Sequence, residues 1–222
     1  DAWIYVVSQA DLIADQTVFF EAMTGGEYMS SLIPWSNANI YYDFGNGGGA
    51  GRINGAWGGS VNTHNIWTLG SSTGTTTPNG TRKSIARDGS IILSNNNNDN
   101  TTGANQPFLI GGGYNNGSGT TNNFDGRIAE VIVFAEVPTE LEQEKIQSYL
   151  SIKYGISKNT TDIAATVGQD ERDYFASDGT VVWDYSVNAP FNNKIAGIGR
   201  DDVSALDQRK SKSNATLSIV SM

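Results

Sequence analysis

The sequence predicts an all-β fold, an antiparallel β-sandwich with one short helix. Up to residue 136 of the 222-residue chain, short β-prone runs alternate with clusters of Gly, Asn, Ser and Thr, a pattern typical of a sandwich. Asp88 and Gly89 lie between two such runs, and Asp-Gly supplies the positive φ values of a tight hairpin turn. Apolar residues recur convincingly at helical spacing in one segment, about residues 139–154.

The expected strands are rich in β-branched and aromatic residues, and the two that flank Asp88-Gly89 should form a hairpin. In the last strand, Glu130 shares one face with Ile128 and Ile132, and apolar residues line the other face. A strand apolar on both faces is expected at the centre of a sheet, where Glu130 would need a basic partner. The expected strands span residues 3–7, 17–22, 40–44, 65–69, 83–86, 91–93, 108–110 and 127–134.

The predicted helix follows the last of these strands. Thr139 and Glu142 form a capping box, and Gly155 is placed to end the helix. Ile146 and Leu150 belong to an apolar stripe that we expect to lie against the sandwich. This helix is expected to be scaffold.

The rest of the chain has a polar stretch and two strand-like runs, residues 180–183 and 194–198. A piece of about 65 residues buries too little apolar surface to be comfortably stable alone. We therefore expect a sandwich domain at residues 1–156 and an extension at residues 157–222 that packs on the same sandwich. Both ends of the chain lie in strand-like runs, and we expect the chain to be a fragment of a longer one.

The composition opposes some partners. A formal net charge of −9 disfavours nucleic acid and anionic membranes, which select clustered Lys and Arg. Acidity suits divalent cations, and it equally suits simple solubility. Cysteine is absent, so the chain has neither disulfides nor thiolate metal sites. No run approaches the roughly 18 apolar residues of a membrane span.

The order of several motifs resembles that of bacterial laminin-G-like, concanavalin A-like jelly rolls. The resemblance covers about residues 1–156 and implies an antiparallel jelly-roll sandwich. It rests on Ile40–Gly45, Ile66–Thr68, Arg87–Gly89, Leu109–Gly112, Phe124–Phe134 and the helix end Tyr149–Gly155.

A second resemblance lies in Val182–Asp184, Asn193–Asp202 and Ala205–Gln208. These segments are similar to one that often follows such jelly rolls in large bacterial surface proteins, including long repeat-containing adhesins. In some of these adhesins, a domain of this kind binds the C-terminal carboxylate of a peptide and depends on calcium. The resemblance implies a monomeric, extracellular module at the bacterial cell surface, with Ca²⁺ as cofactor and a cell-surface peptide or glycan as ligand.

Four aspartates are candidate calcium ligands, because calcium takes about six to eight oxygens from carboxylates, amides and carbonyls in Gly- and Asn-rich loops. Asp201 and Asp202 are adjacent and repel unless a cation or Arg neutralises them. The alternative is that one caps a turn while the other pairs with Arg200. Asp43 lies beside a Gly-rich loop, and Asp99 lies in a run of asparagines.

The ligand itself is expected to meet loop side chains. Trp57 and Tyr114 offer aromatic faces for stacking, while Asn46 and Asn115 offer paired hydrogen bonds. We predict these four residues as ligand contacts.

An enzymatic function is disfavoured. The Glu-x-Asp-x-x-Glu string of concanavalin A-like glycosidases is absent, and His64 is the single histidine, so a multi-histidine zinc site is impossible. Glu21, Glu27 and Glu130 remain as possible carboxylates for a polysaccharide hydrolase or lyase. The alternatives to a peptide-binding adhesion module are thus a lectin-like module, a structural spacer of a long fibre, and, with least support, such an enzyme.

Overall fold

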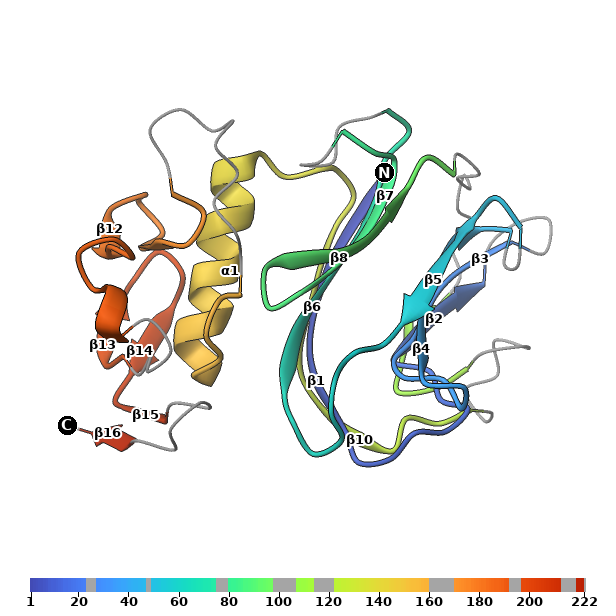
Figure 1. Ribbon diagram of the computed structural model, residues 1–222, viewed down its shortest axis with the longest axis horizontal. Coiled ribbons are helices and arrows are strands. Elements are labelled where there is room, and N and C mark those ends of the chain that lie inside the picture. The colour runs from blue at the N-terminus through green and yellow to red at the C-terminus, as the bar shows by residue number, and fades with distance from the viewer. Residues whose placement is uncertain are drawn as a thin grey trace. The chain divides into compact units, whose positions relative to one another are not determined.

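The computed structural model divides the chain into two compact units, which Figure 1 shows. The sandwich unit comprises Asp1–Ala86 and Ile91–Val137, and the C-terminal unit comprises Pro138–Met222 with the short segment Arg87–Ser90. The structure describes residues 1–22, 27–46, 49–74, 80–97, 107–113, 122–159, 170–191, 197–212 and 219–221.

Two five-stranded antiparallel sheets confirm the predicted antiparallel sandwich. The first, here the β1 sheet, has the order β10-β1-β6-β7-β8 and contains β1 (Ala2–Ala10), β6 (Asn65–Ser71), β7 (Lys83–Arg87), β8 (Ser90–Asn95) and β10 (Gly126–Phe134). The second, here the β4 sheet, has the order β5-β4-β3-β2-β9 and contains β2 (Phe19–Ala22), β3 (Tyr28–Leu32), β4 (Asn39–Gly45), β5 (Arg52–Ala56) and β9 (Leu109–Ile110). In Figure 1 the two sheets are layers seen from the side.

The core of this unit lies between the sheets and is almost entirely apolar. Alternate residues along each strand point to the same face, so every second residue of β1 and β4 enters the core. On the opposite face of the β1 sheet, Gly70 of β6 packs under the ring of Trp3, where a Cβ atom would come within 2.3 Å of the ring. The core residues are Ala2, Ile4, Val6, Val18, Phe19, Met29, Ile33, Ile40, Tyr42, Phe44, Ile53, Trp57, Trp67, Leu69 and Ile85.

The predicted hairpin is confirmed, because Asp88 and Gly89 both have positive φ (52° and 88°) between β7 and β8. The prediction that residues 127–134 form a central strand is wrong. β10 lies at an edge of the β1 sheet, and no residue in it is fully buried. β1, which lies between β10 and β6, is buried on both faces, with nine buried residues, and β6 is also buried along its whole length.

The C-terminal unit contains a helix and small two-stranded ribbons. Its elements are α1 (Glu140–Tyr154), β11 (Tyr174–Phe175), β12 (Val181–Trp183), a 3₁₀ turn η2 (Ala189–Phe191), β13 (Gly199–Asp201), β14 (Leu206–Gln208), β15 (Lys210–Lys212) and β16 (Ile219–Ser221). The ribbons pair β11 with β12, β13 with β14, and β15 with β16. The expected strand at 194–198 is only partly described, and Gly197 and Ile198 precede β13 without joining it.

Helix α1 forms for the predicted reasons. The Thr139 side chain accepts from the Glu142 backbone N–H, the Glu142 side chain accepts from the Thr139 N–H, and Gly155 closes the helix with φ 67°. The expected apolar stripe is absent from its buried face, which comprises Gln147, Ser148, Leu150 and Ser151. No helix among the described residues is long and apolar enough to cross a membrane.

The helix groups with the C-terminal unit, so the division falls at 137/138, earlier than the expected boundary at 156/157. Polar contacts explain this grouping. The backbone N–H of Phe175 donates to Ser148 Oγ (3.0 Å), and Gln208 Nε2 donates to the carbonyls of Ile152 and Lys153 (3.1 and 3.2 Å). Packing of the residues after 156 on the sandwich stays a prediction.

Candidate functional site

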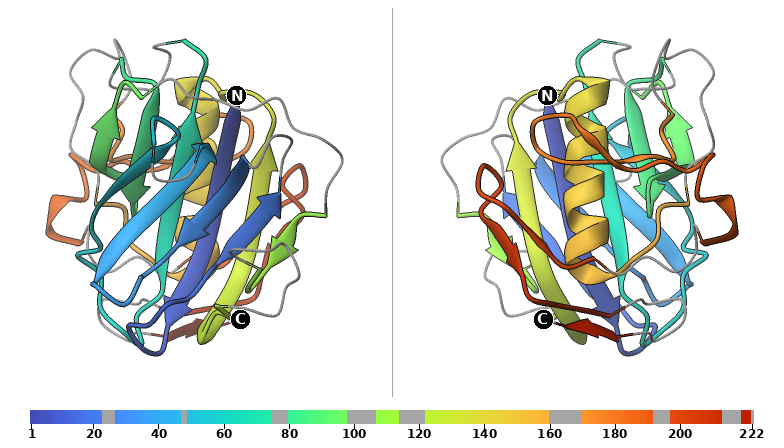
Figure 2. Two further views of the ribbon diagram at one scale, coloured as in Figure 1. Left: turned by 90° about the vertical axis from the view of Figure 1, so that its right-hand side faces the viewer. Right: turned by 90° about the vertical axis from the view of Figure 1, so that its left-hand side faces the viewer.

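A set of polar and aromatic side chains gathers on the outer face of the β4 sheet. The left panel of Figure 2 shows the strands of this sheet from that side. Strand alternation explains their position: Tyr42 and Phe44 enter the core, so Tyr41 and Asp43 point outward. The strand register then places Asn54 opposite Tyr41, and both Ser30 and Arg52 opposite Asp43. We call Ser30, Asn37, Tyr41, Asp43, Arg52 and Asn54 the Tyr41 cluster.

An ion pair forms the base of the Tyr41 cluster. Arg52 binds Asp43 in a bidentate manner, with Nε–Oδ1 at 2.6 Å and Nη2–Oδ2 at 2.9 Å. Ser30 Oγ donates a third hydrogen bond to Oδ2 at 3.0 Å. The Asp43 side chain is fully buried, while that of Arg52 is 20 % exposed. A buried carboxylate that accepts three such bonds is held firmly and fixes the guanidinium above it.

Tyr41 lies beside this pair at the surface. The Arg52 guanidinium stands 4.9 Å from the centre of the Tyr41 ring, and Asn37 Nδ2 donates to the Tyr41 hydroxyl at 2.7 Å. Tyr41 is half-buried, whereas Asn37 and Asn54 are exposed. The arrangement combines a fixed aromatic ring with two amide side chains, which suits a flat ligand that carries hydrogen-bonding groups.

Of the eight predicted site residues, only Asp43 belongs to this cluster, and its oxygens are already bonded to Arg52 and Ser30. Asn46 is exposed in the β4–β5 turn. Trp57, expected to offer a stacking face, is 5 % exposed and packs in the core, because strand β5 leads it inward. Asp99, Tyr114 and Asn115 lie outside the described residues.

Asp201 and Asp202 have separate partners in the C-terminal unit. Asp201 accepts from the backbone N–H of Ser177 (2.9 Å), from Ser177 Oγ (2.6 Å) and from the N–H of Ser204 (3.4 Å). These hydrogen bonds hold the pKa of Asp201 below its usual value. Asp202 pairs with Arg200 at the surface. This is the arrangement stated as the alternative to a metal at this site.

Asp43, Asp201 and Asp202 are therefore each bonded to protein groups. Within the described part of the chain, no group of three or more Asp, Glu, His or Cys side chains is arranged to hold a metal. The carboxylates considered for hydrolysis are dispersed, since Glu21 lies on β2 and Glu130 on β10, in different sheets. Burial raises the pKa of Glu21.

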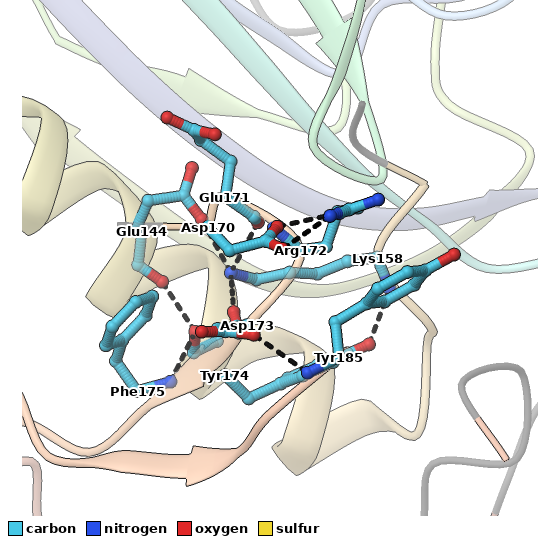
Figure 3. Close-up of polar contacts among 10 residues, drawn as sticks. Glu144, Lys158, Asp170, Glu171, Arg172, Asp173, Tyr174, Phe175 and Tyr185 are labelled. Atoms are coloured by element: carbon cyan, nitrogen blue, oxygen red, sulfur yellow. Dashed lines mark hydrogen bonds and ion pairs between the residues drawn. The ribbon is translucent and has the colours of Figure 1, made fainter. Parts of the chain in front are cut away.

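The C-terminal unit has a buried ionic cluster that the sequence did not reveal (Figure 3). Lys158 Nζ donates to Glu144 Oε2 (2.6 Å) and to the carbonyls of Asp173 (2.6 Å) and Glu171 (3.3 Å). Its side chain is 2 % exposed, and the rings of Tyr174 and Phe175 lie 5.2 and 5.6 Å from the ammonium. We call these six residues the Lys158 cluster.

Burial dominates the electrostatics of the Lys158 cluster. It lowers the pKa of Lys158 and raises that of Glu144, against the mutual attraction of the two charges. Burial also raises the pKa of Tyr174 to about 12. Because three acceptors surround the ammonium and solvent is excluded, this cluster links α1 to residues 171–175 and is closed to a ligand.

Comparison with known proteins covers the two units unequally. A family model described as a domain of unknown function (DUF8202) matches residues 142–222, which lie within the C-terminal unit. A search of curated proteins finds no match.

Two solved structures of Trypanosoma rangeli sialidase are similar in part. The complex with sialic acid is 16 % identical with a TM-score of 0.45, and the match covers 68 % of this chain and 23 % of that chain. The complex with 2,3-difluoro-KDN is 15 % identical with a TM-score of 0.39, covering 60 % and 20 %. This chain spans under a quarter of either sialidase chain, and similarity this low carries no argument about activity.

Proposed function

We propose that the chain is a non-catalytic ligand-binding module of a laminin-G-like bacterial surface adhesin, and that the Tyr41 cluster binds a saccharide. The observation that supports this most is the half-buried Tyr41 ring, held by Arg52 on one side and by Asn37 at its hydroxyl. A ring that is already fixed loses little conformational entropy when a sugar stacks on it. The exposed amides of Asn37 and Asn54 supply donors and acceptors for hydroxyls.

Charge favours a neutral saccharide over a peptide carboxylate at this site. Asp43 already neutralises Arg52 through two hydrogen bonds. The chain as a whole carries a formal net charge of −9, which repels anions at long range. A peptide bound by its C-terminal carboxylate, which the family resemblance implies, is therefore the competing ligand class.

Calcium dependence is a separate proposal, supported by the sequence around Asp99 and by the resemblance. If an ion binds the native state, chelation with EDTA should lower the melting temperature by several degrees, and Asp99→Asn should remove that difference. A melting curve that EDTA does not shift would overturn it.

Binding to immobilised carbohydrates and peptides tests the ligand proposal. Laminarin, dextran and agarose serve as neutral probes, alginate as an acidic probe, and a peptide library with free C-termini as the competing class. We expect retention on a neutral polysaccharide and a loss of at least tenfold in affinity for Tyr41→Ala.

Tyr185→Ala is the matched control, because Tyr185 also lies against an arginine, Arg172, at 4.3 Å, but in the C-terminal unit. It should bind as the wild type does. Selective binding of the peptide library would overturn the saccharide, and wild-type affinity in Tyr41→Ala would overturn the site.

A further inference from the structure

A lysine ammonium is buried in the sandwich unit. Lys83 begins β7, in the β1 sheet, and its side chain is fully buried. Its Nζ donates to the carbonyl oxygens of Phe44 (2.7 Å) and Gly51 (3.1 Å), which belong to the opposite sheet and its β4–β5 turn. A buried cation is tolerated where acceptors such as these replace its water. Lys83 thus reaches across the core to hold one end of the β4–β5 pair.

The two carbonyls that Lys83 binds are next to the ion pair of the Tyr41 cluster. Phe44 follows Asp43 in the chain, and Gly51 precedes Arg52. The backbone N–H of Phe44 also donates to the Gly51 carbonyl, at 3.0 Å. Since β5 is an edge strand, β4 is its one neighbour in the β4 sheet, and Lys83 adds a tie from the opposite sheet.

Carboxylates and carbonyls are also the ligands that calcium uses in proteins. In this part of the sandwich, two basic side chains bind them instead. Arg52 occupies both oxygens of Asp43, and the ammonium of Lys83 bonds the neighbouring carbonyls of Phe44 and Gly51. Around Asp43, which the sequence made a candidate calcium ligand, the side chains of Arg52 and Lys83 therefore supply the positive charge.

We propose that Lys83 is a positioning residue for ligand binding: its ammonium holds the β4–β5 end so that Arg52 stays stacked on Tyr41, and binding at the Tyr41 cluster needs no calcium. This inference rests on the proposed saccharide site. It assigns a role in binding to a residue of the opposite sheet, and it states that binding does not depend on a metal ion. It concerns the Tyr41 cluster alone, so a stabilising ion near Asp99 is compatible with it.

Wild-type protein gives the first test and avoids any risk of misfolding. Affinity for the neutral polysaccharide that binds best, laminarin, dextran or agarose, is measured after chelation with EDTA and again in excess calcium. Equal affinities, within twofold, are expected. A calcium requirement for binding would overturn the metal independence while leaving the saccharide site in place.

The second test reads the position of Arg52 directly and does not depend on a ligand. In nitrogen-15 NMR spectra, the Nε–H of Arg52 should exchange slowly with solvent, because it is hydrogen-bonded to buried Asp43. Lys83→Met should speed that exchange at least tenfold and weaken polysaccharide binding in proportion. Arg172 Nε–H, bonded to Asp170 at 2.7 Å, is the internal reference and should not change.

Lys145→Met is the control variant, since it removes a lysine from helix α1 and should leave both signals as in the wild type. Unchanged Arg52 exchange in folded Lys83→Met would overturn the positioning role. Absence of wild-type binding to every probe would instead overturn the saccharide proposal, while the NMR result would still decide the role of Lys83. If Lys83→Met does not fold, Lys83→Gln, which keeps two hydrogen-bond donors, takes its place. Faster Arg52 Nε–H exchange in Lys83→Gln would then support the positioning role, and unchanged exchange would overturn it.

Discussion

Both units of the molecule contain an aspartate, an arginine and a tyrosine in the same chemical arrangement. In the sandwich unit, Arg52 binds Asp43 through two hydrogen bonds and stands 4.9 Å from the Tyr41 ring. In the C-terminal unit, Arg172 binds Asp170 at 2.7 and 2.5 Å and stands 4.3 Å from the Tyr185 ring. The contacts are alike, but the surroundings differ.

The difference lies in how each set is assembled. Asp170 and Arg172 are two residues apart in a turn, and their side chains are 22 % and 30 % exposed. Asp43 and Arg52 come from paired strands, and Asp43 is fully buried. A local, solvated pair can rearrange if one partner is lost, whereas a buried carboxylate cannot find water. We therefore expect the loss of the arginine to cost more stability in the sandwich unit than in the C-terminal unit, although the contacts are alike.

The units also differ in what fills their interiors. The sandwich unit has a continuous apolar core between two sheets, while the C-terminal unit buries the Lys158 cluster beside a helix whose buried face is largely polar. A unit of this size has little apolar surface to bury, so satisfied polar groups must supply much of its order. Four tests address this contrast.

The largest effect is expected from Lys158→Met. Glu144 would remain half-buried without its ammonium, and removing one partner of a buried pair costs about 3–5 kcal/mol. The measurement is hydrogen exchange by mass spectrometry, peptide by peptide. Protection should fall in peptides from residues 140–191 and stay unchanged in β1 and β6. An equal loss of protection in both units would contradict the idea that the Lys158 cluster stabilises the C-terminal unit alone. Lys145→Met on the same helix is the control.

Removal of each stacked arginine should separate the two Asp–Arg–Tyr sets. Arg52→Met leaves Asp43 buried, with the Ser30 hydroxyl still donating to it, and should cost about 2–3 kcal/mol. Arg172→Met exposes Asp170 to water and should cost about 0–1 kcal/mol. Urea unfolding of the two variants measures the difference, and similar costs would remove the distinction between them.

Two glycines, Gly70 in the sandwich unit and Gly199 in the C-terminal unit, differ in how closely their surroundings are packed. Gly70→Ala would place a methyl group 2.3 Å from the Trp3 ring and should destabilise the sandwich by about 1–3 kcal/mol. A methyl group added at Gly199 of β13 would have no atom within 4 Å of it, so Gly199→Ala should be neutral or stabilise by about 0.5 kcal/mol. Thermal melting of both variants is the readout, and a neutral Gly70→Ala would contradict the close packing.

The smallest effect should come from His64, the single histidine, in the sandwich unit. Burial, and then the nearby charge of Arg127, lower its pKa, with Asp11 acting in the opposite direction. The unfolded chain therefore binds the proton more tightly, so stability is complete above the ordinary pKa near 6.5 and falls as the pH drops through it. Melting temperatures between pH 5 and 8 should show this slope, and His64→Asn should flatten it within that interval.

Local signals predicted local structure well. The capping box at Thr139 and Glu142, the helix end at Gly155 and the turn at Asp88-Gly89 all follow from the geometry of a few adjacent residues, and all are confirmed. The rank of a strand within its sheet is a tertiary property. β1 and β10 are both nine residues long and rich in apolar residues, and which of them lies at the edge of the sheet depends on partners far along the chain.

The site was harder to predict for the same reason. Asp43 is acidic and lies next to a Gly-rich loop, so the sequence pointed to a metal, but the cross-strand register that brings Arg52 to it cannot be seen in either segment alone. Tyr41 was missed because it looks like any strand aromatic, although its alternation with Tyr42 was a readable sign that one of the two faces outward. Lys83 and Lys158 gave no signal, since burial of a lysine is decided by tertiary packing.

The position of β1 has a consequence for synthesis. Its neighbours are β6 and β10, so β1 waits for its second partner about 120 residues further along the chain. At translation rates of about 5–20 residues per second, that wait lasts roughly 6–25 seconds. Throughout it, one edge of β1, whose nine residues all end up buried, is unpaired and prone to aggregate. The sandwich is thus expected to fold late and slowly and to benefit from a chaperone, whereas α1 can form as soon as it emerges.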